Sequence, residues 1–143
     1  MFQNRFKMSV LTRFVRVKDK DVTPAMTDAF DLMHNELEMP SPEWIDEHQC
    51  LEIENEKDEK IYICDPFEGR AFDHLKMLGC RILGPQCVLA CLNFKLEVPS
   101  GGPFYNLSFK GVVISCTSMK KTTREQMHGL VRQMAGKARY LIF

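Results

Sequence analysis

The 143-residue sequence lacks several features that would place it in a specialised class of protein. It contains no apolar run near the roughly 18 residues that span a bilayer. Its first eight residues carry Arg5 and Lys7 with no long apolar stretch behind them, unlike a secretory signal. It has no Cys-x-x-Cys pair, which removes the commonest zinc and redox motifs. What remains is a globular chain, long enough for one domain with a good core or for one small domain plus a fragment.

The sequence also lacks net charge, because 19 basic side chains balance 19 acidic ones. A balanced chain fits poorly with bulk electrostatic binding of nucleic acid, which needs a basic face. The charges are unevenly placed, however. Residues 36–59 are acidic, and residues 120–139 carry six cations opposed only by Glu125. An anionic ligand is therefore expected at the second segment, and a nucleic-acid-binding module built on residues 120–139 is an alternative.

The six cysteines occur singly, several of them inside apolar runs, which predicts reduced and buried thiols. Cys87 and Cys91 stand four residues apart, with His74 and Cys80 nearby in the sequence. A zinc- or cysteine-dependent enzyme is therefore another alternative, although the apolar surroundings argue against it. Asp73 and His74 could act as acid and base, but no nucleophile is placed with them. We predict a non-enzymatic binder without metal or other cofactor.

The apolar pattern predicts alternating strands and helices over residues 10–96. Thr23 and Pro24 form a helix start, with Thr23 as the cap, and Met26 and Met33 then point inward at helical spacing. A second helix ends at Gly79, and a third opens at Gly84-Pro85. Further predicted elements are strands at 10–17, 60–64 and 80–83, and a short helix or turn at 41–45 that carries Trp44 and Ile45. This order predicts the α/β class: a small parallel sheet with helices on both faces.

The pattern restarts after residues 97–104, whose glycines and prolines indicate a linker. A strand is predicted over 112–116, and Thr122 with Glu125 fits a capping box. A helical stripe closed by Gly136 and a further strand over 140–143 follow; the stripe consists of Met127, Leu130, Val131 and Met134. We divide the chain into a complete unit, 8–96, and an incomplete unit, 105–143. The second unit is expected either to lean on the first or to be poorly ordered, because so few elements bury little apolar surface.

The second unit also carries the best candidate site. Its first strand stops at two hydroxyl residues, Thr117 and Ser118, and a helix start with the cation Arg124 follows at once. Hydroxyls at a strand end, a helix N-terminus and a guanidinium are the parts of an anion site. We therefore predict that Thr117, Ser118 and Arg124 bind a phosphate group.

Several segments resemble the BRCT-repeat family, and within it the N-terminal repeats of the DNA topoisomerase II-binding proteins. The resemblance spans roughly residues 9–136 and is specific over 60–136. It is carried by Ile61–Phe67, Phe72–Lys76, Leu78–Ile82, Gly84–Gln86, Ile114–Ser118 and Arg124-Glu125. The BRCT region of a Rho-family exchange factor has a similar Cys-Arg-x-x-Gly-Pro segment and is an alternative relative.

The resemblance implies a nuclear, non-enzymatic scaffold of the DNA-damage checkpoint and of replication initiation. The implied partners are phosphorylated proteins such as the checkpoint clamp and origin-firing factors, with no membrane and at most weak direct contact with DNA. In the family the first repeat is degenerate and lacks a working phosphate pocket, and here no hydroxyl ends the strand Phe14–Asp19. By position Thr117 would be the hydroxyl donor, Ser118 the N–H donor and Arg124 the arginine. The family's pocket lysine has no counterpart, so the second site is expected to be incomplete.

Overall fold

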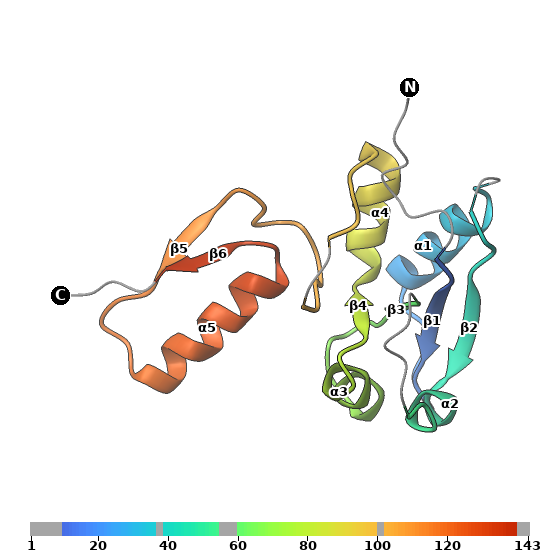
Figure 1. Cartoon of the computed structure of the whole chain (residues 1–143), viewed down its shortest axis with the longest axis horizontal. Helices are drawn as coiled ribbons and strands as arrows, with labels where there is room; N and C mark the ends of the chain where they lie inside the picture. Colours follow the sequence, from blue (N-terminus) through green and yellow to red (C-terminus); the bar gives the residue numbers. More distant parts are fainter. Residues whose placement is uncertain (1–9, 37–38, 55–59, 100–101, 140–143) are drawn as a thin grey trace.

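The computed structural model describes residues 10–36, 39–54, 60–99 and 102–139. Within them the chain forms a four-stranded sheet with its helices and, farther along, a two-stranded sheet with one helix (Figure 1). Both sheets are parallel. The predicted α/β class, with a small parallel sheet flanked by helices, is confirmed. No described helix is long and apolar enough to cross a membrane.

The first sheet has the strand order β2-β1-β3-β4. Phe14 of β1 aligns with Trp44 of β2 on one side and with Ile63 of β3 on the other. β3 is fully buried, which explains why its sequence is continuously apolar instead of alternating. The strand bounds are β1 Thr12–Arg16, β2 Glu43–Asp46, β3 Ile61–Ile63 and β4 Arg81–Leu83.

Three helices of the first unit, α1, α3 and α4, begin where the sequence predicts, and α2 was not predicted. Thr23 caps α1, and its hydroxyl accepts a hydrogen bond from the Met26 N–H at 3.3 Å. Gly79 follows α3 with a φ of +78°, a conformation that glycine adopts without strain. Pro85 opens α4, as expected. The bounds are α1 Pro24–His34, α2 Glu47–Leu51, α3 Arg70–Met77 and α4 Pro85–Phe94.

These helices cover both faces of the first sheet, and each face has its own core. Phe14 and Ile63 point into one core, where they meet α1 and α4 through Met26, Met33 and Val88. The opposite core gathers side chains of α2, α3 and the other strand positions, among them Val15, Tyr62, Phe72 and Leu75. Burial of these apolar side chains is the main stabilising contribution to the unit.

The predicted short helix or turn at 41–45 is wrong, because Trp44 and Ile45 lie in strand β2. Four residues are too few to show a period, so the partner strand decides the conformation. Arg13 on β1 donates from Nε to Glu43 Oε1 at 2.7 Å and so supports the pairing. The Trp44 ring stacks on Phe30 of α1, with centroids 4.8 Å apart.

The second unit consists of β5 Val113–Ser115, α5 Lys121–Gln133 and β6 Lys137–Arg139. The predicted capping box is wrong: α5 starts two residues earlier, with Lys120 instead of Thr122 as its N-cap, so Thr122 lies inside the first turn. The strand predicted over 140–143 falls outside the described residues, while β6 occupies the three residues before it.

The helical stripe on α5 is only partly buried. Val131 is 2% exposed, but Met127 and Leu130 are 38% and 54% exposed, so the predicted stripe does not form one buried face. In Figure 1, α5 lies along one side of the two strands. Two strands and one helix provide no further layer for these side chains, which explains their exposure.

The predicted linker packs onto the first unit over part of its length. Val98 and Phe104 of the linker, and Leu107 just after it, pack against the core that α1 and α4 share. Phe104 also forms a parallel bridge with Leu83 at the outer edge of β4, and its carbonyl accepts from the Gly84 N–H at 2.9 Å. The second unit thus leans on the first at its beginning. The boundaries 8–96, 97–104 and 105–143 stay a prediction.

Candidate functional site

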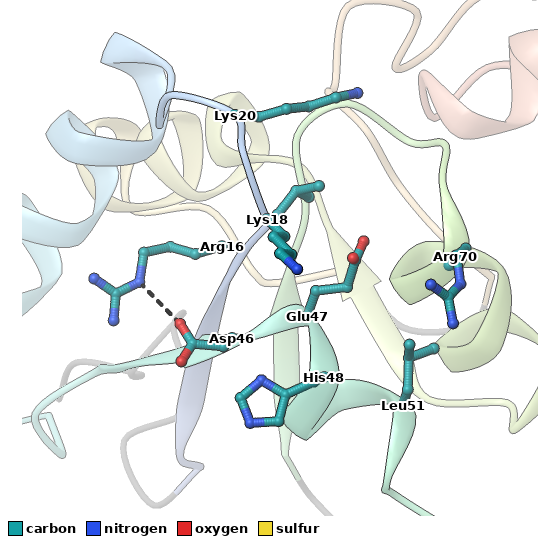
Figure 2. Close-up of a pocket in the computed structure, with 9 residues that line it drawn as sticks. Arg16, Lys18, Lys20, Asp46, Glu47, His48, Leu51 and Arg70 are labelled. Atoms are coloured by element: carbon teal, nitrogen blue, oxygen red, sulfur yellow. Dashed lines mark ion pairs between the residues drawn. The ribbon is translucent and has the colours of Figure 1, made fainter.

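The carboxyl ends of β1 and β2 open into a cavity of about 610 Å³ (Figure 2). The strand order places β2 on one side of β1 and β3 on the other, so the switch point of the sheet, where open parallel sheets bind ligands, lies between β1 and β3, next to this cavity. The loop after β1, the start of α2 and the start of α3 supply the lining.

Exposed charges dominate this cavity. The cations are Arg16, Lys18, Lys20 and Arg70, and the carboxylates are Asp46 and Glu47. Figure 2 shows Lys18 and Glu47 between the Arg16–Asp46 ion pair and Arg70. That ion pair spans 3.7 Å, and the Arg16 guanidinium also lies over the Trp44 ring, 5.4 Å from its centroid. Exposed pairs of this kind add little stability and exchange partners easily.

The chemistry of this edge suits an anionic or mixed-charge protein segment better than a lone phosphate. Among the described residues, no serine or threonine lines the cavity, and its two carboxylates offset part of the charge of its four cations. The sequence did not predict this site, because residues 36–59 form one acidic segment in which Asp46 and Glu47 do not stand out. The signal that could have revealed it is the series of cations Arg16, Lys18 and Lys20 at the end of a predicted strand.

The predicted anion-binding residues lie at the corresponding edge of the second sheet. Thr117 and Ser118 follow the carboxyl end of β5 and are exposed, and Ser118 has a φ of +57°. Arg124 lies on the first turn of α5 and is half-buried. The three residues thus sit around one strand-to-helix connection. No described contact joins their side chains, so their grouping as a phosphate site stays a prediction.

The electrostatics of this connection favour an anion. The N–H of Arg124 bonds to the Lys120 carbonyl at 2.9 Å, which leaves the N–H groups of the first turn of α5 for a ligand. Arg124 Nε is buried and has no hydrogen-bond partner within the described residues. Lys120 and Lys121 add exposed positive charge at the same helix end.

Among the described residues, the cysteines and His74 do not gather into a group that could hold a metal ion. No group of three or more metal-ligating side chains gathers there. Burial raises the pKa of Cys50 to about 12 and that of Cys64 still higher, so both remain thiols at neutral pH. His74 Nε2 lies 2.7 Å from the Ile53 carbonyl oxygen, a contact that fastens α3 to the chain after α2. These contacts are structural.

A polar contact joins the two units next to the first-sheet edge. Asp65, just after β3, accepts from the Thr23 hydroxyl at 2.6 Å and from the Tyr105 hydroxyl at 2.7 Å. The Tyr105 ring packs edge-on against Phe67, with centroids 4.9 Å apart, and its backbone N–H donates to the Gln133 carbonyl of α5. Tyr105 therefore contacts the first unit with its side chain and the second with its backbone.

Comparison with known proteins gives a match to a family model and similarity to solved structures. The model of the family "TopBP1, BRCT0 domain" matches residues 10–107, more than half of the chain. The crystal structure of yeast Rtt107 aligns over 100% of this chain and 34% of its own, with 14% sequence identity and a TM-score of 0.46. The chain thus spans about a third of the length of that protein.

Proposed function

Because the chain belongs to the TopBP1 BRCT0 family, we propose that it is a non-enzymatic scaffold module of the DNA-damage checkpoint and of replication initiation. BRCT domains are typically non-enzymatic protein-interaction modules, and relatives of this type are checkpoint and replication scaffolds. The module acts in the nucleus through protein–protein contacts. Its partners are phosphorylated checkpoint or replication proteins, including the checkpoint clamp and origin-firing factors.

The proposal assigns different roles to the two units. The first unit, 8–96, makes protein contacts at its charged edge and supports its neighbour, while the second unit, 105–143, reads a phosphorylated side chain. In that reading the Thr117 hydroxyl and the Ser118 N–H hold the phosphate and Arg124 neutralises it. The single observation that supports this assignment is that Arg124 Nε, on the first turn of α5, is buried without a hydrogen-bond partner among the described residues. A phosphate supplies the missing acceptor and matches the helix end.

A peptide titration tests the assignment. A phosphothreonine peptide and its unphosphorylated twin are titrated against the chain by isothermal calorimetry. We expect the phosphopeptide to bind at least tenfold more tightly. Thr117→Ala and Arg124→Ala should each weaken its binding, by about 10- to 100-fold for Arg124, because a hydrogen bond to a charged group contributes about 1.5–3 kcal/mol.

Two matched variants control this experiment. Thr122→Ala removes an exposed hydroxyl of the same helix, and Arg132→Ala removes an exposed cation two turns farther along. Both should leave phosphopeptide affinity within about twofold, since a single exposed charge contributes little. Equal binding by Thr117→Ala, Arg124→Ala and the unchanged chain would refute the phosphate site. Binding that ignores phosphorylation, falls steeply with salt and includes duplex DNA would favour a nucleic-acid module instead.

A further inference from the structure

A groove between the two units lies apart from both strand edges described above. It encloses about 510 Å³, and we call it the interunit groove; it is lined by Lys76, Gly102–Phe104, Gly129, Arg132, Gln133 and Ala135–Lys137. The segment between the units is bonded to both of them, since the Tyr105 N–H donates to the Gln133 carbonyl at 2.6 Å and the Gly84 N–H donates to the Phe104 carbonyl at 2.9 Å. In Figure 1 the C-terminal end of α5 faces this segment. The walls of the groove are therefore held together by the chain itself.

Three exposed cations surround the interunit groove: Lys76 of α3, Arg132 of α5 and Lys137 of β6. None of the described residues that line it carries a carboxylate, in contrast to the cavity at the first-sheet edge. None of the three cations forms an ion pair with a described residue. Cations near the end of a helix often bind its last carbonyls, but those of Gln133 and Met134 already accept backbone N–H groups. The three side chains are thus available to pair with an external anionic group.

Small and apolar residues complete the lining, and Gly129 is the most informative of them. It lies inside α5, where glycine is unfavourable, and a Cβ at this position would meet no atom within 4 Å. Packing therefore does not require a glycine here. Gly136 differs, because a Cβ there would come within 2.8 Å of the Val131 side chain. The missing side chain at Gly129 leaves this side of the groove open.

The position of the groove on α5 separates it from the exposed apolar side chains of that helix. Gly129, Arg132 and Gln133 are spaced three and four residues apart and share one face of α5, whereas Met127 and Leu130 lie on another. The groove is also on the β6 side of the second sheet. In the first sheet the corresponding strand, β2, is the outermost one, and the remaining strands lie on the far side of β1. The groove is thus an outer surface bounded wholly by described residues.

Charge and shape together decide which occupant fits. Carboxylates would pair with the three cations, and an apolar side chain would contact Pro103 and Phe104. Duplex DNA binds a broad basic face instead of a hollow with an apolar lining. A second copy of the chain would present Asp46 and Glu47 on its folded surface and not on an extended segment.

We propose that the interunit groove binds a short acidic segment of a partner protein, with one apolar side chain among its carboxylates. The groove then adds a contact surface that needs both units, because α3 supplies one cation and α5 and β6 supply the other two. This surface does not depend on the phosphate site at Thr117 and Arg124.

A synthetic peptide tests the proposal. The probe is Asp-Glu-Asp-Phe-Asp-Glu, titrated into the 15N-labelled full chain at up to ~1 mM, the range in which weak peptide binding is measurable. We expect saturable chemical-shift changes at the amides of Gly102, Gly129 and Gly136. A peptide with Lys in place of each acid should bind at least tenfold more weakly, because the charges then repel. A peptide with Ser in place of Phe should bind at least threefold more weakly, because it buries less apolar surface.

A substitution that fills the groove locates the binding. Gly129→Leu places a side chain in the open space of the groove and should lower peptide affinity at least tenfold. Gln126→Leu is its matched control, since Gln126 is exposed on the same helix and does not line the groove, and affinity should stay within about twofold. The spectrum of each variant shows that it is folded.

A second pair of variants tests the charge without changing the shape of the groove. Lys76→Gln combined with Lys137→Gln removes two of the three cations and should lower peptide affinity at least fivefold. Lys95→Gln combined with Lys110→Gln removes the same net charge from exposed positions outside the lining, and affinity should stay within about twofold.

Two arginines of α5 distinguish this groove from the phosphate site. Arg124 and Arg132 are eight residues apart, which is about 12 Å along the helix axis. Arg132→Ala should weaken binding of the acidic peptide at least threefold and leave the phosphopeptide unaffected, whereas Arg124→Ala should do the opposite. Failure of one site is thus measured separately from failure of the other.

Four results would overturn the proposal. Equal binding of the acidic and lysine-bearing peptides would remove the charge argument. Unchanged peptide affinity in folded Gly129→Leu would place the binding elsewhere. Displacement of the peptide by an equal concentration of short duplex DNA would make nucleic acid the occupant. A concentration-dependent dimer, seen by light scattering and abolished by Gly129→Leu, would make a second copy of the chain the occupant.

Discussion

Tyr105→Phe isolates the hydrogen bond that joins the second unit to the first. The variant keeps the ring against Phe67 and removes only the hydroxyl that donates to Asp65 at 2.7 Å. A hydrogen bond to a carboxylate contributes about 1.5–3 kcal/mol, but Tyr105 is half-buried and water can replace its hydroxyl. Asp65 also keeps the hydroxyl of Thr23. We therefore expect a loss near the lower limit, about 1–1.5 kcal/mol of unfolding free energy.

Urea denaturation followed by fluorescence measures this loss. Trp44 is the only tryptophan of the chain and packs against Phe30 and Phe14, so its emission reports on the first unit. A double-mutant cycle of Tyr105→Phe with Asp65→Ala separates the pair from the other contacts of Asp65. The coupling energy should be about 1 kcal/mol, and a value below about 0.3 kcal/mol would refute the reasoning.

The same pair has a signature at high pH. The hydrogen bond to Asp65, together with burial, raises the pKa of Tyr105 to about 12, from an ordinary value of 10. A pKa that is higher in the folded state means that the stabilisation is complete below pH 10 and is lost as the pH rises from about 10 to about 12. In Tyr105→Phe, the free energy of unfolding should not show this decrease between pH 10 and pH 12. Identical pH profiles for both proteins above pH 10 would contradict the assignment.

Three further substitutions test the packing. Gly84→Ala should destabilise the chain by about 2 kcal/mol or more, because a Cβ at this position would collide with the Tyr105 carbonyl. Gly129→Ala on α5 is its control, since a Cβ there meets open space, and it should be neutral or stabilising by up to about 1 kcal/mol. The urea midpoints of the two variants measure this difference in stability. Phe14→Ala, at a fully buried ring, should cost about 3–5 kcal/mol, and a loss below 1 kcal/mol would contradict its place in the core. Thr23→Ala removes the cap of α1 and one hydrogen bond to Asp65, so it should lower the free energy of unfolding by about 1–2 kcal/mol, measured by thermal unfolding. Thr27→Ala, at an exposed site on the same helix, is the control and should have a smaller effect.

Much of the first unit could be predicted from the sequence, because its signals are local. The Thr23-Pro24 cap, the glycine after α3 and the apolar strand β3 each act within a few residues. Strand β2 could not be predicted, because its conformation depends on pairing with β1, some 30 positions earlier. Local pattern cannot show such a partner.

The candidate sites also differ in whether their residues are close in the sequence or are brought together by the fold. Thr117, Ser118 and Arg124 are close in the sequence, so a motif reveals them, and the structure places them around one connection. The charged edge of the first sheet draws on Arg16, Asp46 and Arg70, which only the fold brings together. Exposure of Met127 and Leu130 was also unpredictable, since helical spacing shows that a face exists but not whether another layer covers it.

The bridge between Phe104 and Leu83 has a consequence for chains built from successive units. It ends the first sheet with the chain's own backbone, so a following unit cannot extend that sheet and must form a separate one. The two units of this chain then meet through Phe104, Tyr105 and Leu107 instead of sharing one sheet. A substitution that destabilises one unit therefore has little effect on the stability of the next. A tandem array of such units can gain or lose a unit while each remaining unit still folds cooperatively.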